Sequence, residues 1–240
     1  MTEIIAELVS IPGVRGMLSG RLEYRMDTQV AAHVPGRAAG ALILSPHPFM
    51  GGHMDLPLLE HISSQVTNTG LPTLRFDYGG VGQSEGEPFD VGSAMDLFWK
   101  TGTAPQDPVL IDEARAVLAW FSQQVNGAIV LIGYSFGAFV ATQIRDQSTA
   151  GIALVAPTIT HHDYDAFTND TFPTLIIAGA GDFATGDEEL INWVNALPGP
   201  TALEHIRDGD HFFRQSEAHV GELIASFITD LTCPLAGECP

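Results

Sequence analysis

A serine inside a short, glycine-bounded turn is the residue of this sequence with the clearest capacity for chemistry. The segment Gly133-Tyr134-Ser135-Phe136-Gly137 follows the apolar run 128–132 and precedes the small-residue segment 138–141. G-x-S-x-G between a strand and a helix is the pattern of a nucleophile elbow, a sharp turn that exposes the serine hydroxyl and needs glycines to avoid collisions. We therefore predict that Ser135 is a nucleophile. The alternative is a tight turn whose serine caps the following helix.

A serine hydroxyl needs a base to remove its proton, and that base needs a carboxylate to fix its tautomer. In the chain order that accompanies this elbow, both follow the serine. Asp182 comes after the strand-like run 173–178 and His211 after the strand-like run 201–206, so both are expected at the sheet edge where Ser135 lies. Alternatively, Asp182 is a helix N-cap and His211 a packed core residue. Other carboxylates nearby are less suitable by position: Asp187, Asp208 and Asp210.

Backbone N–H groups close to the serine would complete this chemistry. A tetrahedral intermediate carries a negative oxygen, which is stabilised by the N–H of the residue after the nucleophile and by an N–H from the loop after the third strand. Phe136 occupies the first position. The loop 45–55 follows the third strand, where the second donor is expected, and Phe49 or Met50 is predicted to donate its backbone N–H there. These residues form the predicted oxyanion hole.

Metal and cofactor sites are not indicated by the sequence. His47 and His53 are close enough in one loop to suggest a metal, but no carboxylates cluster with them. We therefore predict that His47 organises its loop. Cys233 and Cys239 lie in the final eight residues, where they are interpreted as unpaired thiols rather than as a disulfide or a metal site. We expect neither a cofactor nor a metal.

The elements that would position these groups alternate along the chain. Short apolar runs indicate parallel strands that are covered on both faces: 41–45, 72–76, 128–132, 151–155 and 173–178. Apolar spacings of three and four residues indicate helices between them: 55–69, 109–125, 136–147, 187–197 and 216–230. The segments 3–10 and 18–26 predict an antiparallel opening pair. The fold class is α/β, a mostly parallel, doubly wound sheet with an antiparallel N-terminal edge.

A single domain is expected over residues 1–231, followed by a C-terminal tail at 232–240. The longest segment without a clear period is 79–108, and loops of that length are functional or carry a short helix of their own. Only the segment 157–172 separates two predicted strands near the site. It leaves no room for a separate lid domain.

The composition excludes several classes of partner. The 240 residues include 10 Lys and Arg against 29 Asp and Glu, a formal net charge of −19. Such an excess repels phosphate backbones and anionic lipid, so we expect no nucleic-acid and no membrane partner. With 45% apolar residues the chain can form a large core. Neither a leader-like start nor an apolar run near the ~18 residues of a membrane span is found, and a cytoplasmic location is expected.

These motifs together resemble the α/β-hydrolase superfamily, in particular the small, lidless, dienelactone-hydrolase-like bacterial serine hydrolases with H-P-x-x-G-G after the third strand. The resemblance spans residues 41–213. It rests on five segments: Pro46-His47-Pro48-Phe49-Met50-Gly51-Gly52, the segment 74–86, the elbow at Ser135, Gly181-Asp182, and Gly209-Asp210-His211-Phe212-Phe213. It implies the α/β-hydrolase fold and a Ser-Asp-His triad, while substrate is not fixed by fold.

One departure from that family concerns the walls of the site. The segment 87–108 is longer than the resemblance implies and could cover the site, and the loop 157–172 either lines it or is a solvated polar loop. The predicted pocket residues are His47, Phe98, Trp99, Tyr134, His161 and Tyr164.

The leading functional hypothesis is a serine hydrolase. It would cleave a carboxylic ester or thioester of a small to medium, partly apolar acyl substrate through an acyl-enzyme. An acyltransferase with the same triad and a noncatalytic binding protein that keeps the fold are the alternatives. A nucleotide site on the glycine-rich segment 79–86 is disfavoured, since it has neither G-x-G-x-x-G nor a Gly-Lys-Ser/Thr ending. The expected oligomeric state is a monomer or a homodimer.

Overall fold

The computed structural model describes residues 3–27, 38–101 and 104–232. Its strands are β1 (Ile4–Pro12), β2 (Met17–Arg25), β3 (Ala38–Leu44), β4 (Thr73–Phe76), β5 (Ala128–Tyr134), β6 (Thr149–Val155), β7 (Thr174–Gly181) and β8 (Thr201–Asp210). Its helices are α1 (Pro57–Asn68), α2 (Val91–Thr101), α3 (Asp107–Gln124), α4 (Phe136–Ile144), α5 (Asp187–Ala196) and α6 (Glu217–Thr232), with short 3-10 helices η1 (Pro48–Met50) and η2 (Asp165–Asn169). The elements predicted from the sequence are all present.

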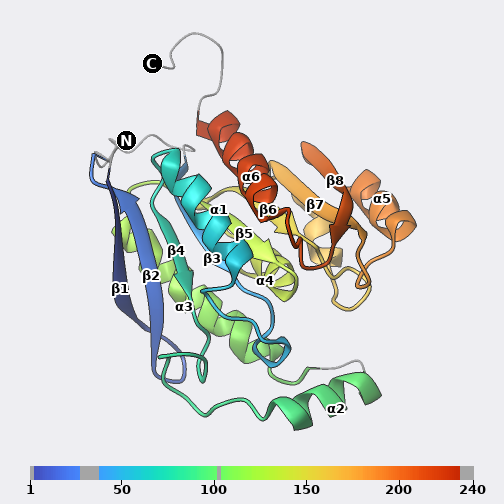
Figure 1. The fold of residues 1–240 in the computed structure, drawn as a ribbon, viewed down its shortest axis with the longest axis horizontal. Helices are drawn as coiled ribbons and strands as arrows, with labels where there is room; N and C mark the ends of the chain where they lie inside the picture. The colour runs from blue at the N-terminus through green and yellow to red at the C-terminus, as the bar shows by residue number, and fades with distance from the viewer. Residues whose placement is uncertain (1–2, 28–37, 102–103, 233–240) are drawn as a thin grey trace.

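The described strands form one eight-stranded sheet in the order β1-β2-β4-β3-β5-β6-β7-β8. β1 and β2 are antiparallel, β2 is antiparallel to β4, and every pair from β4 through β8 is parallel. The mostly parallel sheet with an antiparallel N-terminal edge is therefore confirmed. Because β5 to β8 are neighbours, the turns at their carboxyl ends meet at one edge of the sheet (Figure 1).

Helices cover both faces of the sheet. In β3, Leu42 and Leu44 pack into the core beneath α3 and α4, whereas Ala41 and Ile43 pack beneath α1 and α6. Alternate side chains of a strand point to opposite faces, so a strand buried on both faces is apolar at every position. This is the physical reason that the central strands could be recognised as continuous apolar runs.

Helix α2 lies apart from these layers. It has no buried residue, packs on η1, and projects from the lower edge of the molecule (Figure 1). It is a short helix within the segment 79–108, one of the two possibilities that the length of that segment suggested. No helix in the described ranges is long and apolar enough to cross a membrane. Cys233 and Cys239, and with them nearly all of the predicted tail, lie outside the described residues.

Candidate active site

The turn between β5 and α4 holds Ser135 in a conformation that side chains rarely adopt. Its backbone has φ 57° and ψ −118°, a region that costs free energy for any residue with a Cβ. A Cβ on Gly133 would lie 2.1 Å from the Gly137 carbonyl oxygen, and a Cβ on Gly137 would lie 2.2 Å from the Leu44 carbonyl oxygen. Both glycines are therefore required by close backbone approach, as the elbow pattern predicts.

Three side chains from the ends of β5, β7 and β8 form a hydrogen-bonded chain. Ser135 Oγ lies 3.0 Å from His211 Nε2, and His211 Nδ1 lies 2.8 and 3.0 Å from the two carboxylate oxygens of Asp182. Since Nδ1 faces a carboxylate, it carries the proton, which leaves Nε2 free to accept from the serine. The side chains of His211 and Asp182 are 7% and 3% exposed, so water competes little for these contacts.

Neighbouring groups hold this chain in place. Tyr134 donates its hydroxyl to the His211 carbonyl at 3.0 Å, and Asp182 Oδ1 also accepts from the Ala184 N–H at 2.7 Å. Burial, with the charges of Asp182 and Asp210 nearby, raises the pKa of Tyr134, so its hydroxyl keeps the proton it donates. The ring of Phe183 lies 4.7 Å from that of His211 and shields it from one side.

Two of the other carboxylates considered in the sequence, Asp187 and Asp210, lie away from the His211 ring nitrogens. Asp187 begins α5 and lies 3.2 Å from His205 Nε2, while Asp210 accepts from the Phe212 N–H. Asp182 is the carboxylate on the His211 ring.

The backbone N–H groups predicted to form the oxyanion hole differ in whether they already donate a hydrogen bond within the protein. Phe136 is the first residue of α4, where an N–H has no acceptor within the helix. Phe49 N–H instead donates to His47 Nδ1 at 3.2 Å, and Met50 N–H donates to the His47 carbonyl at 2.9 Å. The two donors predicted in this loop are thus occupied inside the η1 turn. The sequence places both residues in this loop but does not reveal these bonds.

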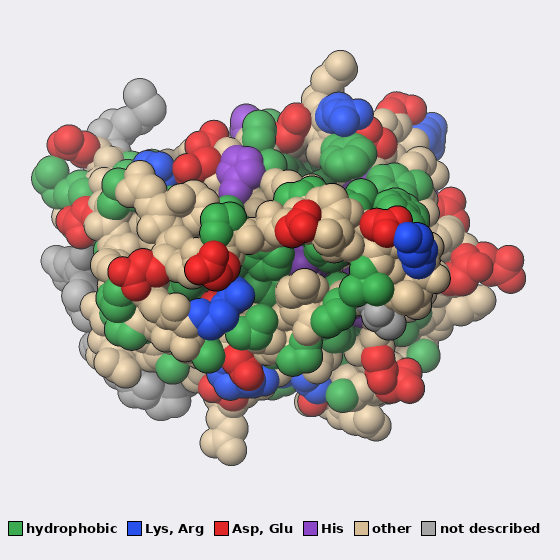
Figure 2. Space-filling model, turned by 90° about the horizontal axis from the view of Figure 1, so that it is seen from below, with side chains coloured by type: hydrophobic (Ala, Val, Ile, Leu, Met, Phe, Trp, Pro, Cys, Tyr) green, Lys and Arg blue, Asp and Glu red, His purple; other side chains and the backbone are tan. Residues whose placement is uncertain are grey.

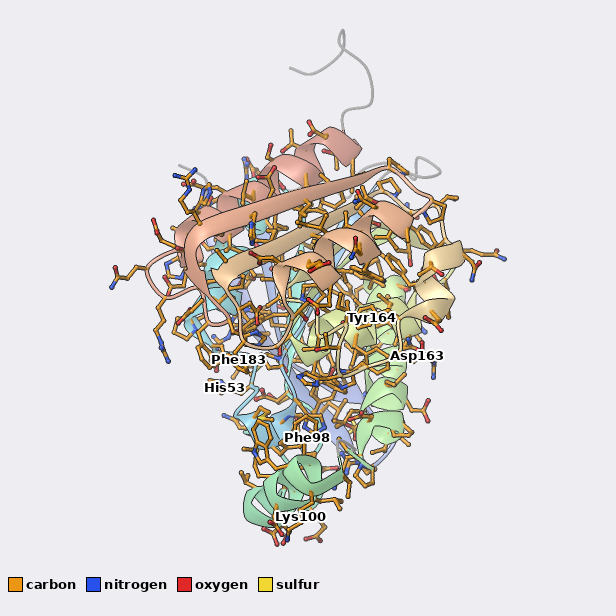
Figure 3. The ribbon with its side chains drawn as sticks, turned by 90° about the vertical axis from the view of Figure 1, so that its right-hand side faces the viewer. His53, Phe98, Lys100, Asp163, Tyr164 and Phe183 are labelled. Carbon is orange, nitrogen blue, oxygen red and sulfur yellow. The ribbon has the colours of Figure 1, made fainter. Side chains whose placement is uncertain are left out.

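A cavity of about 560 Å³ opens beside Ser135. Five of the six predicted pocket residues line it: His47, Phe98, Trp99, Tyr134 and His161. Tyr164 does not; it is buried against Phe139 and Trp193, behind the wall, with its hydroxyl 3.3 Å from the Thr158 N–H. A long loop allows its aromatic residue to turn into the core, which sequence position alone does not decide. Figure 3 shows Tyr164 on the side of the α5 layer, away from Phe98.

Further lining residues had not been predicted. Phe183, 71% exposed, stands at the mouth, and Leu56, Leu58, Ala184 and Arg214 add to the walls. Phe183 follows Asp182 directly, so the sequence signal that could have identified it as a lining residue was an aromatic residue in the turn after a strand. The lower face of the molecule carries hydrophobic side chains around its middle, with acidic and basic side chains scattered around them (Figure 2). This mouth is largely apolar.

Both loop histidines accept a backbone N–H of their own turn through Nδ1, His47 from Phe49 and His53 from Asp55, each at 3.2 Å. His47 is almost fully buried, and burial lowers its pKa although Asp107 nearby opposes the shift. Within the described ranges no three His, Cys, Asp or Glu side chains are grouped to hold a metal ion. In the glycine-rich segment 79–86, Gly79 N–H donates to the buried carboxylate of Glu113 at 2.9 Å.

Comparison with known proteins agrees with this fold. The chain is 27% identical over 220 residues to an uncharacterized protein of Rickettsia prowazekii, covering 86% of this chain and 85% of that one. An alpha-beta serine hydrolase homologue from Coxiella burnetii is 26% identical with a TM-score of 0.71, covering 94% of this chain and 97% of the other. A lidless a/b serine hydrolase from Xanthomonas campestris has a TM-score of 0.74 at 21% identity, covering 97% of both chains. The alpha/beta hydrolase domain model matches residues 40–229, and the chain therefore belongs to the alpha/beta hydrolase family.

Proposed function

We propose that this protein is a serine hydrolase that cleaves carboxylic esters or thioesters through an acyl-enzyme. The observation that carries the proposal is the contact of Ser135 Oγ with His211 Nε2 at 3.0 Å, on a ring whose other nitrogen faces Asp182. In this arrangement His211 takes the serine proton as Oγ attacks the carbonyl carbon, and then returns it to the leaving group. Water, activated by the same imidazole, releases the acyl group and restores the serine.

The cavity supports a neutral, partly apolar acyl group of small to medium size. Its walls are mainly aromatic and aliphatic, and its volume lies in the range of small-molecule sites. Arg214 is the cation among its lining residues, and it is paired with Asp210. Together with the net charge of −19, this favours substrates without several negative charges.

A screen of p-nitrophenyl esters of increasing chain length, run beside acyl thioesters, tests the proposal. Wild-type protein should hydrolyse at least one series and should be labelled at Ser135 by a fluorophosphonate. Ser135→Ala should do neither. If wild-type protein remained unlabelled and inactive throughout, the protein would be a noncatalytic member of the fold, and the proposal would be wrong.

Transfer of the acyl group to an alcohol or amine uses the same intermediate. Adding increasing concentrations of a primary alcohol to the ester assay separates the two reactions. For a hydrolase, the free acid should remain the main product at millimolar alcohol. A new ester as the main product would identify an acyltransferase.

A further inference from the structure

A carboxylate from another element faces the imidazole behind the η1 turn. Asp107, the first residue of α3, places Oδ1 3.2 Å from His47 Nε2. The two side chains are 20% and 5% exposed, and neither of these two atoms has a hydrogen-bond partner elsewhere in the described part of the chain. The contact is a close approach of the two atoms rather than a well-aligned hydrogen bond.

The other ring nitrogen determines which tautomer His47 must adopt. Nδ1 accepts from the Phe49 N–H at 3.2 Å, so it carries no proton. The proton of the neutral ring is then on Nε2, where it faces the Asp107 carboxylate. Burial lowers the pKa of His47, which favours this neutral ring over a protonated one that could not accept from Phe49. Asp107 and Phe49 thus select the same tautomer from opposite sides.

A second histidine lies beside the same carboxylate. His162 Nε2 lies 3.7 Å from Asp107 Oδ2, its Nδ1 lies 2.8 Å from Thr158 Oγ1, and its ring stacks on Phe139 with centroids 4.6 Å apart. Asp107 therefore lies between imidazoles from two different loops that both line the cavity. This arrangement ties the start of α3 to both walls of the site.

We propose that Asp107 is a positioning residue that acts through His47 to hold the Phe49 N–H for the oxyanion of the reaction. The inference rests on the proposed hydrolase function. In the resting protein the Phe49 N–H donates to the neutral Nδ1 of His47. When the substrate carbonyl oxygen becomes negatively charged, it is the stronger acceptor, because hydrogen bonds to charged oxygen are about twice as strong as neutral ones. The N–H can then turn to the oxyanion, together with that of Phe136.

Loss of the Asp107 carboxylate would disturb the position of the Phe49 N–H by changing the tautomer of His47. Without Asp107, His47 is free to protonate Nδ1, and two N–H donors would then face each other across the turn. The turn would have to open, and the Phe49 N–H would lose its position. Removal of one oxyanion donor costs about 10²- to 10³-fold in kcat, so mispositioning should cost up to about 10²-fold.

The test compares Asp107→Ala and Asp107→Asn in the best ester assay. We expect Asp107→Ala to lower kcat by about 10- to 100-fold with KM changed less than about twofold, because the oxyanion exists only after attack. Asp107→Asn should retain most of the activity, because its amide oxygen still accepts from Nε2. Asp112→Ala is the matched control, since Asp112 is an exposed carboxylate on the same helix, paired with Arg115, and should behave as wild type.

Two measurements separate this role from a general effect on folding. In a double-mutant cycle, Asp107→Ala should have little further effect once His47→Ala is present. Nitrogen-15 NMR of the histidine rings, which requires no activity, should show His47 protonated at Nε2 in wild type and Asp107→Asn, and mixed tautomers in Asp107→Ala. Equal losses of kcat in Asp107→Asn and Asp107→Ala, full additivity with His47→Ala, or a wild-type ring protonated at Nδ1 would each overturn the inference. A wild-type protein with the expected tautomer but no hydrolysis would instead overturn the proposed function, and the oxyanion role with it.

Discussion

Phe98 is expected to set the preference for acyl-chain length. It lies on α2, lines the cavity, and has its ring centroid 5.6 Å from that of Phe49 and 6.1 Å from that of His161. A longer acyl chain that reaches from Ser135 toward α2 would pack against this group of rings, whereas an acetyl group would not reach it. Replacing Phe98 with Ala should therefore weaken the binding of long chains selectively.

The magnitude follows from the apolar surface of the acyl chain that Phe98 would otherwise bury. A buried methylene is worth about 0.8 kcal/mol, so exposing about two methylenes of the chain costs about 1.6 kcal/mol, or about 15-fold in KM. We expect Phe98→Ala to raise KM by about this factor for octanoyl p-nitrophenyl ester and by less than about twofold for the acetyl ester. Trp99→Ala should have a smaller effect, because the Trp99 side chain is 69% exposed.

Two further variants control this experiment. Lys100 lies on the outer side of α2 (Figure 3) and pairs with Asp96, so Lys100→Ala should leave both KM values unchanged. Because α2 packs on η1 and has no buried residue, truncation of Phe98 could loosen the helix. Phe98→Leu keeps an apolar contact with Phe49 and should retain most of the chain-length preference. An equal rise of KM for acetyl and octanoyl esters in Phe98→Ala, or no change for either, would refute the reasoning and place α2 outside substrate binding.

Three other predictions follow from the site. Ser135→Ala should lower kcat by about 10⁴-fold or more while unfolding at the same denaturant concentration as wild type, because only a hydroxyl is removed; near-normal turnover would exclude Ser135 as the nucleophile. Asp182→Asn should lower kcat by up to about 10⁴-fold through the wrong His211 tautomer, whereas Asp187→Asn, at the start of α5 beside His205, should leave it unchanged; the reverse pattern would reassign the acid. Burial lowers the pKa of His162 below its ordinary value of 6.5, so just below that pH the unfolded chain binds more protons than the folded one, and the free energy of unfolding should fall as pH falls through this window. Urea unfolding at about pH 7.5 and about pH 5.5 should show a smaller loss for His162→Gln than for wild type, and an equal loss in both would mean that other groups account for it.

The sequence by itself determined the sheet and the order of the candidate triad. Strands buried on both faces are apolar at every position, so β3, β5, β6 and β7 stood out as short continuous runs. The nucleophile elbow could also be recognised from the sequence. The backbone passes so close to Gly133 and Gly137 that neither position can hold a side chain, so both must be glycine. Asp182 and His211 could be found because parallel neighbouring strands end at the same edge, so the position of a residue directly after a strand places it in space.

Only the tertiary structure decided how the loops close around that edge. Phe98 and Tyr164 both lie in long segments, yet one lines the cavity and the other is buried behind its wall. The contact of Asp107 with His47 joins the start of a helix to a distant turn, and the bonds of Phe49 and Met50 depend on the conformation of η1. Strands and tight turns leave local patterns because steric contact between near neighbours selects their residues. The path of a long loop depends instead on packing against residues far along the chain, and this leaves no comparable local pattern.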